Sequence, residues 1–239
     1  MLERKKGPWH EGLEAARANT VPGILLIVIA VVIVGSYYVV PPVQTALDAI
    51  ADVKVRAGFI FAICSTAIFG GLLPVLVQQM RPSARSPEAW KALPFLMGFW
   101  AVKGAEIDLL YRVQAWMFGD NSALSTIVAK VIFDEFVYVP LWAVPTMVIG
   151  YAWHENGYDL RRTLRRLGSG WYRKRVVPMM LANWAVWVPT VALIYCLKLP
   201  LQLPVQNVVL CLWAIMVMFL AKAAEADATA AEARGGVVL

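Results

Sequence analysis

The chain has 239 residues, of which 60% are apolar and 16% are charged, whereas soluble domains average about 45–50% apolar and about 25% charged residues. Lys and Arg together number 22 and Asp and Glu number 16, so the net charge is +6, and the mean hydropathy is +0.62. These values exclude a disordered chain, a fibrous repeat and a disulfide scaffold, and they predict a membrane protein.

Residues 1–21 form a charged N-terminal segment that we expect to be cytoplasmic. It contains Glu3, Glu11 and Glu14, whereas a mitochondrial transit peptide is poor in acidic residues. The uncharged run that follows, 24–40, has no small-residue cleavage site after it. We therefore predict that 22–56 contains a retained transmembrane helix and a loop, rather than a removed signal.

Six hydrophobic segments predict an all-α fold, a polytopic membrane helix bundle with about six transmembrane helices. About 20 residues cross the ~30 Å hydrocarbon core as a helix, and within lipid the backbone must satisfy its own polar groups. A turn at 198–202, with Pro200 and Pro204, is expected between the last two helices. The segments lie at roughly 22–40, 57–79, 93–117, 126–153, 176–197 and 203–222.

The charges of the connecting loops predict the orientation of these helices. With six spans, 16 of the 22 Lys and Arg residues fall on the side that holds both termini, three fall on the other side and three lie within spans. Because cytoplasmic loops carry the excess of positive charge, both termini are predicted to be cytoplasmic.

The most basic loop is 154–175, which holds seven of those 16 residues. We expect it to lie against anionic lipid headgroups, with the docking of a lipid, nucleotide or protein partner as the alternative. Residues 223–239 form a charged, Ala-rich tail, for which the sequence leaves a short frayed helix and disorder open.

Charged side chains inside the third and fourth predicted spans are the most informative feature of the sequence. Each costs about 2.5–3.5 kcal/mol at the centre of a membrane helix, so we expect them to face the bundle interior or a wet cavity. Three are positive and four are negative, which leaves one acid in excess. The seven residues are Lys103, Glu106, Asp108, Arg112, Lys130, Asp134 and Glu135.

Ion pairs within each helix are allowed by the spacing of these residues, because side chains three or four positions apart share a helix face. The pairs are Lys103 with Glu106, Asp108 with Arg112, and Lys130 with Asp134. A short loop makes the two helices antiparallel neighbours, so a contact between Arg112 and Asp134, or between Lys130 and Asp108, is also allowed. Two hypotheses follow: a polar pathway through the membrane, or an internal salt-bridge network that fixes helix packing.

We find no pattern typical of an active site, a metal site or a cofactor site. Cys64, Cys196 and Cys211 lie in apolar stretches without metal-ligand spacing, and His10 and His154 fall outside the spans or at their edge. The chain has no HExxH sequence, P-loop or nucleophile elbow, and no zinc-finger spacing or basic helical arm. We therefore predict no enzymatic activity, no metal, no cofactor and no nucleic-acid partner.

At the same charged residues the chain resembles the Mpv/PMP family of small peroxisomal and inner-mitochondrial membrane proteins, which also has bacterial relatives. The resemblance covers roughly 57–222, so that the helix at 22–40 looks like an addition. The family's Gly-Pro…His…Trp-Tyr pattern is matched in part by Gly104, Ala105, Asp108, Leu110 and Tyr111. Its Lys-x3-Asp-Gln-x4-Pro motif appears as Lys130, Asp134, Glu135 and Pro140. Its downstream Trp-Pro…Phe…Val-Pro…Trp region is matched in part by Asn183, Trp187, Pro189, Tyr195, Pro200, Asn207 and Trp213.

Departures from the family pattern occur in each motif. Ala105 replaces the usual Pro, Asp108 replaces the usual His, and Glu135 stands where Gln is expected. Val188 separates Trp187 from Pro189, Gly70-Gly71 replaces a Gly-Asp pair, and the Arg after the Val-Pro turn is missing. The resemblance implies a small helical bundle with proposed channel or pore activity for small solutes.

We therefore expect an integral membrane protein that acts as a channel or pore through the charged residues of its third and fourth helices. The alternative is a structural or scaffolding protein whose intramembrane charges only fix packing, and the second alternative is a secondary transporter. The expected partner is the lipid bilayer of the cell (inner) membrane, with an organelle membrane as the alternative. The sequence leaves the solute and an oligomeric state open.

Overall fold

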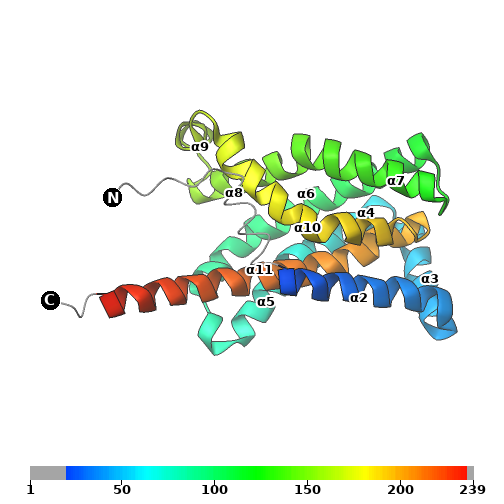
Figure 1. Cartoon of the computed structure of the whole chain (residues 1–239), viewed down its shortest axis with the longest axis horizontal. Coiled ribbons are helices and arrows are strands. Elements are labelled where there is room, and N and C mark those ends of the chain that lie inside the picture. The colour runs from blue at the N-terminus through cyan, green and yellow to red at the C-terminus, as the bar shows by residue number, and fades with distance from the viewer. Residues whose placement is uncertain (1–19, 236–239) are drawn as a thin grey trace. The chain divides into compact units, whose positions relative to one another are not determined.

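The computed structural model of the chain describes residues 20–235, with side chains as far as Phe219. The predicted N-terminal segment 1–21 therefore lies almost wholly outside the described residues. All regular structure within 20–235 is helical (Figure 1), which confirms the all-α prediction. The tail from residue 223 is helical as far as Gly235, because α11 continues to that residue.

The helices follow one another with short connections. The α-helices are α2 (Thr20–Val39), α3 (Pro41–Ala57), α4 (Phe59–Thr66), α5 (Leu73–Met80), α6 (Pro87–Phe118), α7 (Leu124–Phe133), α8 (Val144–Glu155), α9 (Leu160–Leu167), α10 (Val177–Ile194) and α11 (Leu199–Gly235). Three π-helical segments, η1 (Ala67–Leu72), η3 (Asp134–Ala143) and η4 (Tyr172–Val176), join α-helices into longer rods, and η2 (Pro82–Ala84) is one 3₁₀ turn.

Three of these rods are long and apolar enough to cross a membrane: Phe59–Met80, Tyr172–Ile194 and Leu199–Phe219. A fourth candidate is formed by Gly23–Val39 and Pro41–Ala57 together. The chain bends by 101° between these two helices, and they meet that standard only if they are counted as one span. The described residues therefore contain three or four candidate membrane helices. The predicted third and fourth spans are helical as well, in α6 and in α7–η3–α8, and these two rods carry all the described buried charges except Lys54 on α3.

Residues 41–56, predicted to be a loop, form the helix α3 instead. Pro41 and Pro42 lack the backbone N–H that would continue α2, and proline is well suited to the first turn of the next helix. The predicted turn at 198–202 is also displaced. The chain turns at 195–198, while Pro200 lies in the first turn of α11 and Pro204 lies within that helix. Charge and proline content suggested loops where proline in fact begins a helix.

The helices divide into two compact units. The first unit contains the described residues up to Arg56 together with Leu109–Val205, and the second contains Ala57–Asp108 together with the residues from Gln206 onward. Helices α6 and α11 therefore contribute residues to both units.

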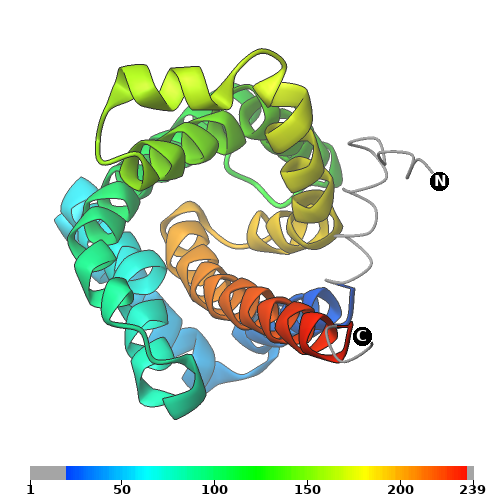
Figure 2. The same cartoon turned by 90° about the vertical axis from the view of Figure 1, so that its left-hand side faces the viewer.

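In the first unit α10 packs along α2 (Figure 1). Gly23 allows this approach, because a Cβ atom at that position would lie 2.7 Å from Cγ2 of Val186. Beyond this contact, η3, α8, α9 and η4 enclose an apolar core, and α9 lies against α8 (Figure 2). The buried core residues are Val139, Val144, Val148, Ala152, Leu167, Val176 and Met180.

In the second unit α4 contacts both α6 and α11 through small and polar residues. A Cβ atom at Gly104 would lie 2.7 Å from Oγ1 of Thr66 and would also strike the carbonyl oxygen of Ala62, so only glycine permits this helix approach. The Asn207 side chain donates to Ser65 Oγ at 2.9 Å and accepts from Thr66 Oγ1 at 3.0 Å. These bonds join α11 to α4.

Candidate functional site

Five of the seven charged residues predicted to line a pathway are buried. Glu106 is half-buried, and Arg112 is exposed at the surface of α6. Because a charge placed in an apolar interior is strongly disfavoured unless it is paired or hydrogen-bonded, the partners of the buried groups decide what they can do. The five buried residues are Lys103, Asp108, Lys130, Asp134 and Glu135.

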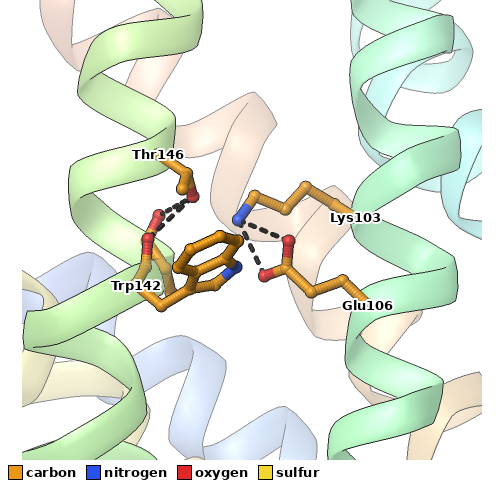
Figure 3. Close-up of polar contacts among 5 residues, drawn as sticks. Lys103, Glu106, Trp142 and Thr146 are labelled. Atoms are coloured by element: carbon orange, nitrogen blue, oxygen red, sulfur yellow. Dashed lines mark hydrogen bonds and ion pairs between the residues drawn. The ribbon is translucent and has the colours of Figure 1, made fainter.

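Lys103 and Glu106 form the ion pair that their spacing predicts. The Lys103 ammonium lies 2.8 Å from Oε1 and 3.1 Å from Oε2 of Glu106, so both carboxylate oxygens accept from it (Figure 3). Both residues belong to the second unit, where Asp108 is buried one turn further along α6.

The first unit holds the other buried charges at an irregular part of a helix. Asp134 is the first residue of η3, a π-helix of ten residues that contains Pro140. Proline removes a backbone donor and clashes with the preceding turn, which accounts for the wider helix here. Where η3 meets α8, the Thr146 hydroxyl donates to the backbone oxygens of Trp142 at 2.7 Å and of Ala143 at 3.1 Å (Figure 3). Such π-helical segments are frequent at functional sites.

Asp134 is only 5% exposed, and its carboxylate is held by a tyrosine. The Tyr195 hydroxyl donates to Oδ2 of Asp134 at 2.5 Å. The Tyr195 ring also packs edge-on against the ring of Tyr111, with centroids 5.6 Å apart. Tyr195 lies at the end of α10, so this bond ties η3 to α10.

Lys130 lies next to the same tyrosine and forms no ion pair among the described residues, although it interacts electrostatically with Asp120. Its side chain is 1% exposed, and its ammonium lies 5.7 Å from the centroid of the Tyr195 ring, within the distance of a cation–π interaction. Among the described residues no ion pair joins Asp134 to Lys130 or to Arg112, so these two contacts, which the spacing allows, are not formed. The Asp134 carboxylate is already bound by Tyr195, and the helix changes from α to π at that residue. A contact between Lys130 and Asp108 would join the two units and stays a prediction.

Glu135 is 1% exposed, and one of its carboxylate oxygens, Oε2, has no hydrogen-bond partner in the part of the chain that the structure describes. Its backbone carbonyl accepts a bond of 2.9 Å from Nε1 of Trp184, and the Trp184 ring packs against that of Phe136 at 4.9 Å between centroids. The backbone of Glu135 is therefore anchored while its carboxylate is not.

Three buried amide side chains with an unpaired atom among the described residues were not predicted as site residues: Gln114, Gln202 and Asn156, whose nitrogen donates to the carbonyl of Ala152 at 2.7 Å while its Oδ1 has no partner there. Gln114 on α6 is completely buried, and neither its nitrogen nor its oxygen finds a partner among the described residues. Gln202 on α11 donates to the carbonyl of Leu197 at 3.0 Å, while its Oε1 stays unpaired within the same range. The only feature of the sequence that could have identified Gln114 or Gln202 as a candidate site residue is an uncharged amide within an apolar stretch.

The remaining motif positions of the resemblance are buried or half-buried in the helices. Tyr111 and Trp187 are buried, Asn183 and Trp213 are half-buried, and Pro189 lies within α10. The three cysteines are free thiols, and the described residues contain no cluster of three or more His, Cys, Asp or Glu side chains that could hold a metal ion.

Comparison of the chain with protein-family models, with curated proteins and with solved structures gives no match. The resemblance to the Mpv/PMP family therefore stays a prediction that rests on the sequence motifs.

Proposed function

We propose that the protein is a polytopic membrane protein of the Mpv/PMP type that forms a path for small solutes. The observation that carries the proposal is Glu135, a buried carboxylate with one oxygen unpaired beside Asp134 on a π-helical segment. An ionisable group buried at membrane depth is disfavoured by several kcal/mol and is a functional site by default. A hydrated solute, or a cation that passes through, would supply the partner that the protein does not.

Six spans, with both termini cytoplasmic, fit this proposal. The two rods that do not qualify as spans by composition, α6 and α7–η3–α8, carry all the described buried charges except Lys54 on α3. Helices that line a polar path need an apolar surface on one side only, so their lower hydropathy is expected. The distribution of Lys and Arg over the loops supports the same topology and favours the cell (inner) membrane.

A solute-flux assay tests the proposal. Purified protein in vesicles loaded with small fluorescent or radioactive solutes of increasing size is expected to release them up to a size limit. Glu135→Gln is expected to change the rate or the charge preference, whereas Glu88→Gln, the same substitution at an exposed position on α6, is expected to have no effect. Flux that saturates and follows a pH gradient would instead indicate a secondary transporter.

A structural or scaffolding role is the second candidate, and two bonds favour it. The Tyr195 hydroxyl binds the Asp134 carboxylate, and the Trp184 indole binds the Glu135 backbone. Both bonds join η3 to α10, as a network that only fixes packing would do. Under this alternative, Glu135→Gln would alter the stability of the protein in detergent, and folded protein in vesicles would release no solute.

A further inference from the structure

Helix α9 and the segment η4 carry an uncompensated positive charge. Seven cationic side chains occur here, and all of them are exposed: Arg161, Arg162, Arg165, Arg166, Arg173, Lys174 and Arg175. Between residues 156 and 224 the only acidic residue is Asp159. Within the described part of the chain none of the seven cations forms an ion pair.

The cations of the 80–92 connection, by contrast, have partners within their own unit. Arg81 lies over the ring of Phe219 at 4.4 Å, Arg85 donates to the carbonyl of Gln79 at 2.8 Å, and Lys91 forms an ion pair with Glu88 at 2.7 Å. Of these three cations Lys91 alone has an acidic partner, whereas among the described residues none of the seven at α9 and η4 has one, and Arg165 donates only to the carbonyl of Arg161 at 3.4 Å.

Asp159 forms no ion pair with these described cations, and its side chain instead caps the helix. Its Oδ1 accepts from the backbone N–H of Arg162 at 3.0 Å, and its carbonyl accepts from the Thr163 hydroxyl at 2.7 Å. This capping fixes where α9 begins and therefore which residues share each face.

The faces of α9 differ sharply. At 3.6 residues per turn the four arginines of α9 lie together on one side, while Thr163 and Leu167 are buried on the other. Leu160 and Leu164 lie beside the buried face, yet each is 55% exposed. A short helix with arginines on one side and exposed leucines on the other matches the pattern of helices that lie in the plane of a membrane interface.

The segment η4 places three further cations at the start of a membrane helix. Gly168 and Gly170 adopt positive φ angles of 65° and 75°, which let the chain reverse after α9. The Tyr172 hydroxyl donates to the carbonyl of Pro140 at 2.8 Å and fixes η4 against η3. Residues 173–175 thus stand in the first turns of the candidate span Tyr172–Ile194.

We propose that α9 and η4 together bind the phosphate groups of anionic phospholipids. Arginine forks bind phosphate oxygens bidentately, and clusters of four to eight basic residues next to a membrane helix attract anionic lipid. Leu160 and Leu164 enter the boundary between headgroups and acyl chains. This surface does not depend on solute conduction, so it can be tested independently of the proposed function.

The test is lipid retention by the full-length protein, measured by native mass spectrometry in a neutral detergent with added phosphatidylglycerol or phosphatidylcholine. The test variant carries Arg→Gln at 161, 162, 165 and 166, and the matched control carries R81Q, R85Q and K91Q. We expect selective retention of phosphatidylglycerol, at least tenfold weaker in the test variant, since each basic residue near a membrane surface contributes about fivefold in affinity. The control variant is expected to retain the lipid as the unaltered protein does.

Equal retention of both lipids, or an unchanged preference for phosphatidylglycerol in the test variant, would overturn the proposal. So would displacement of the lipid by a short single-stranded DNA at equal concentration, because the surface would then be a general polyanion site. If the test variant does not fold, the unaltered protein still decides the matter. Its retention of phosphatidylglycerol must fall steeply with added salt, and retention that is insensitive to salt would contradict the assignment.

Discussion

The hydroxyl of Tyr195 donates a 2.5 Å hydrogen bond to the carboxylate of Asp134, a residue 61 positions earlier in the chain. This bond connects the end of α10 to the first residue of η3, and both residues are buried. The carboxylate would otherwise lie unpaired in an apolar interior, so Tyr195 is what allows an acid at this position.

Removal of that hydroxyl is expected to destabilise the protein. Tyr195→Phe keeps the ring that packs on Tyr111 but leaves a buried carboxylate oxygen without its donor, which costs about 1–3 kcal/mol. Thermal unfolding in detergent measures the effect. Tyr158→Phe, which removes an exposed hydroxyl that bonds His154 Nδ1 at 2.9 Å, measures the smaller loss expected at the surface, and a double variant of Tyr195→Phe with Asp134→Asn is expected to lose less than the sum of the two single losses. Additive losses would show that the two side chains are not coupled.

Replacing glycine by alanine at two positions of α6, Gly104 and Gly98, is expected to change the stability of the protein in opposite directions. Gly104→Ala places a Cβ atom against Thr66 and the Ala62 carbonyl, and this overpacking is expected to cost about 1–3 kcal/mol. Gly98, on the same helix, has open space around it, so Gly98→Ala is expected to stabilise α6 by about 0.5–1 kcal/mol. Unfolding midpoints of the two variants compare them directly, and equal shifts would contradict the close approach of the helices.

The indole of Trp184 is expected to hold the backbone of Glu135 in place. Trp184→Phe removes the Nε1 donor, leaves most of the ring in contact with Phe136, and is expected to cost about 0.5–1.5 kcal/mol. Hydrogen exchange of the η3 amides should increase in this variant. Trp116→Phe, at a tryptophan that is exposed on α6, serves as the control, and protection of η3 that is the same in both variants would refute the role of the bond.

An ion pair outside the predicted spans gives a pH dependence. Lys198 lies 2.7 Å from Asp48 and joins the turn before α11 to α3. The hydrogen bond from Lys198 lowers the pKa of Asp48 below its ordinary value of 3.8, and the same bond raises the pKa of Lys198 above 10.5. The stabilisation that Asp48 gives the folded state is full above pH 3.8 and is lost as the pH falls through its lowered pKa. The stabilisation that Lys198 gives is full below pH 10.5 and is lost as the pH rises through its raised pKa.

Hydrogen exchange of α3 measures this contact. The α3 amides should be equally protected across neutral pH and should lose protection only at the two extremes. In Asp48→Asn the protection should be lower at neutral pH and should not change further in acid. An Asp48→Asn variant with the acid dependence of the unaltered protein would show that another group is responsible.

Hydropathy predicted that the six apolar segments are helical, because length and apolar content are local properties of the chain, but the turn residues placed the turn before α11 too late. Neither signal predicted α3 or α9, since the charges of both resemble those of a loop, and neither predicted the described π-helical segments, of which only η3 contains a proline, Pro140. The pairing of Lys103 with Glu106 was predictable because both lie on one helix. The pairing of Asp134 with Tyr195 was not, because it joins residues far apart in sequence, and the spacing rule pointed to Lys130 instead.

Whether α6 crosses the membrane is testable with single cysteines in a chain that lacks Cys64, Cys196 and Cys211. We expect Ser86→Cys and Ser169→Cys to react with a membrane-impermeant maleimide from the cytoplasmic side only. Ser125→Cys, after α6, should react from the opposite side. Labelling of positions 86 and 125 from the same side would mean that α6 does not span the membrane and that the six-span topology is wrong.

Single-channel recording from purified protein in a planar bilayer is the sharpest test of a polar path through the membrane, with Asp134→Asn, Glu135→Gln and the exposed Glu88→Gln measured alongside. We expect discrete openings whose conductance or ion selectivity changes in the two variants at η3 and stays unchanged in Glu88→Gln. A silent bilayer, with the protein shown to be inserted and folded, would contradict the polar path and leave the buried charges with a structural role.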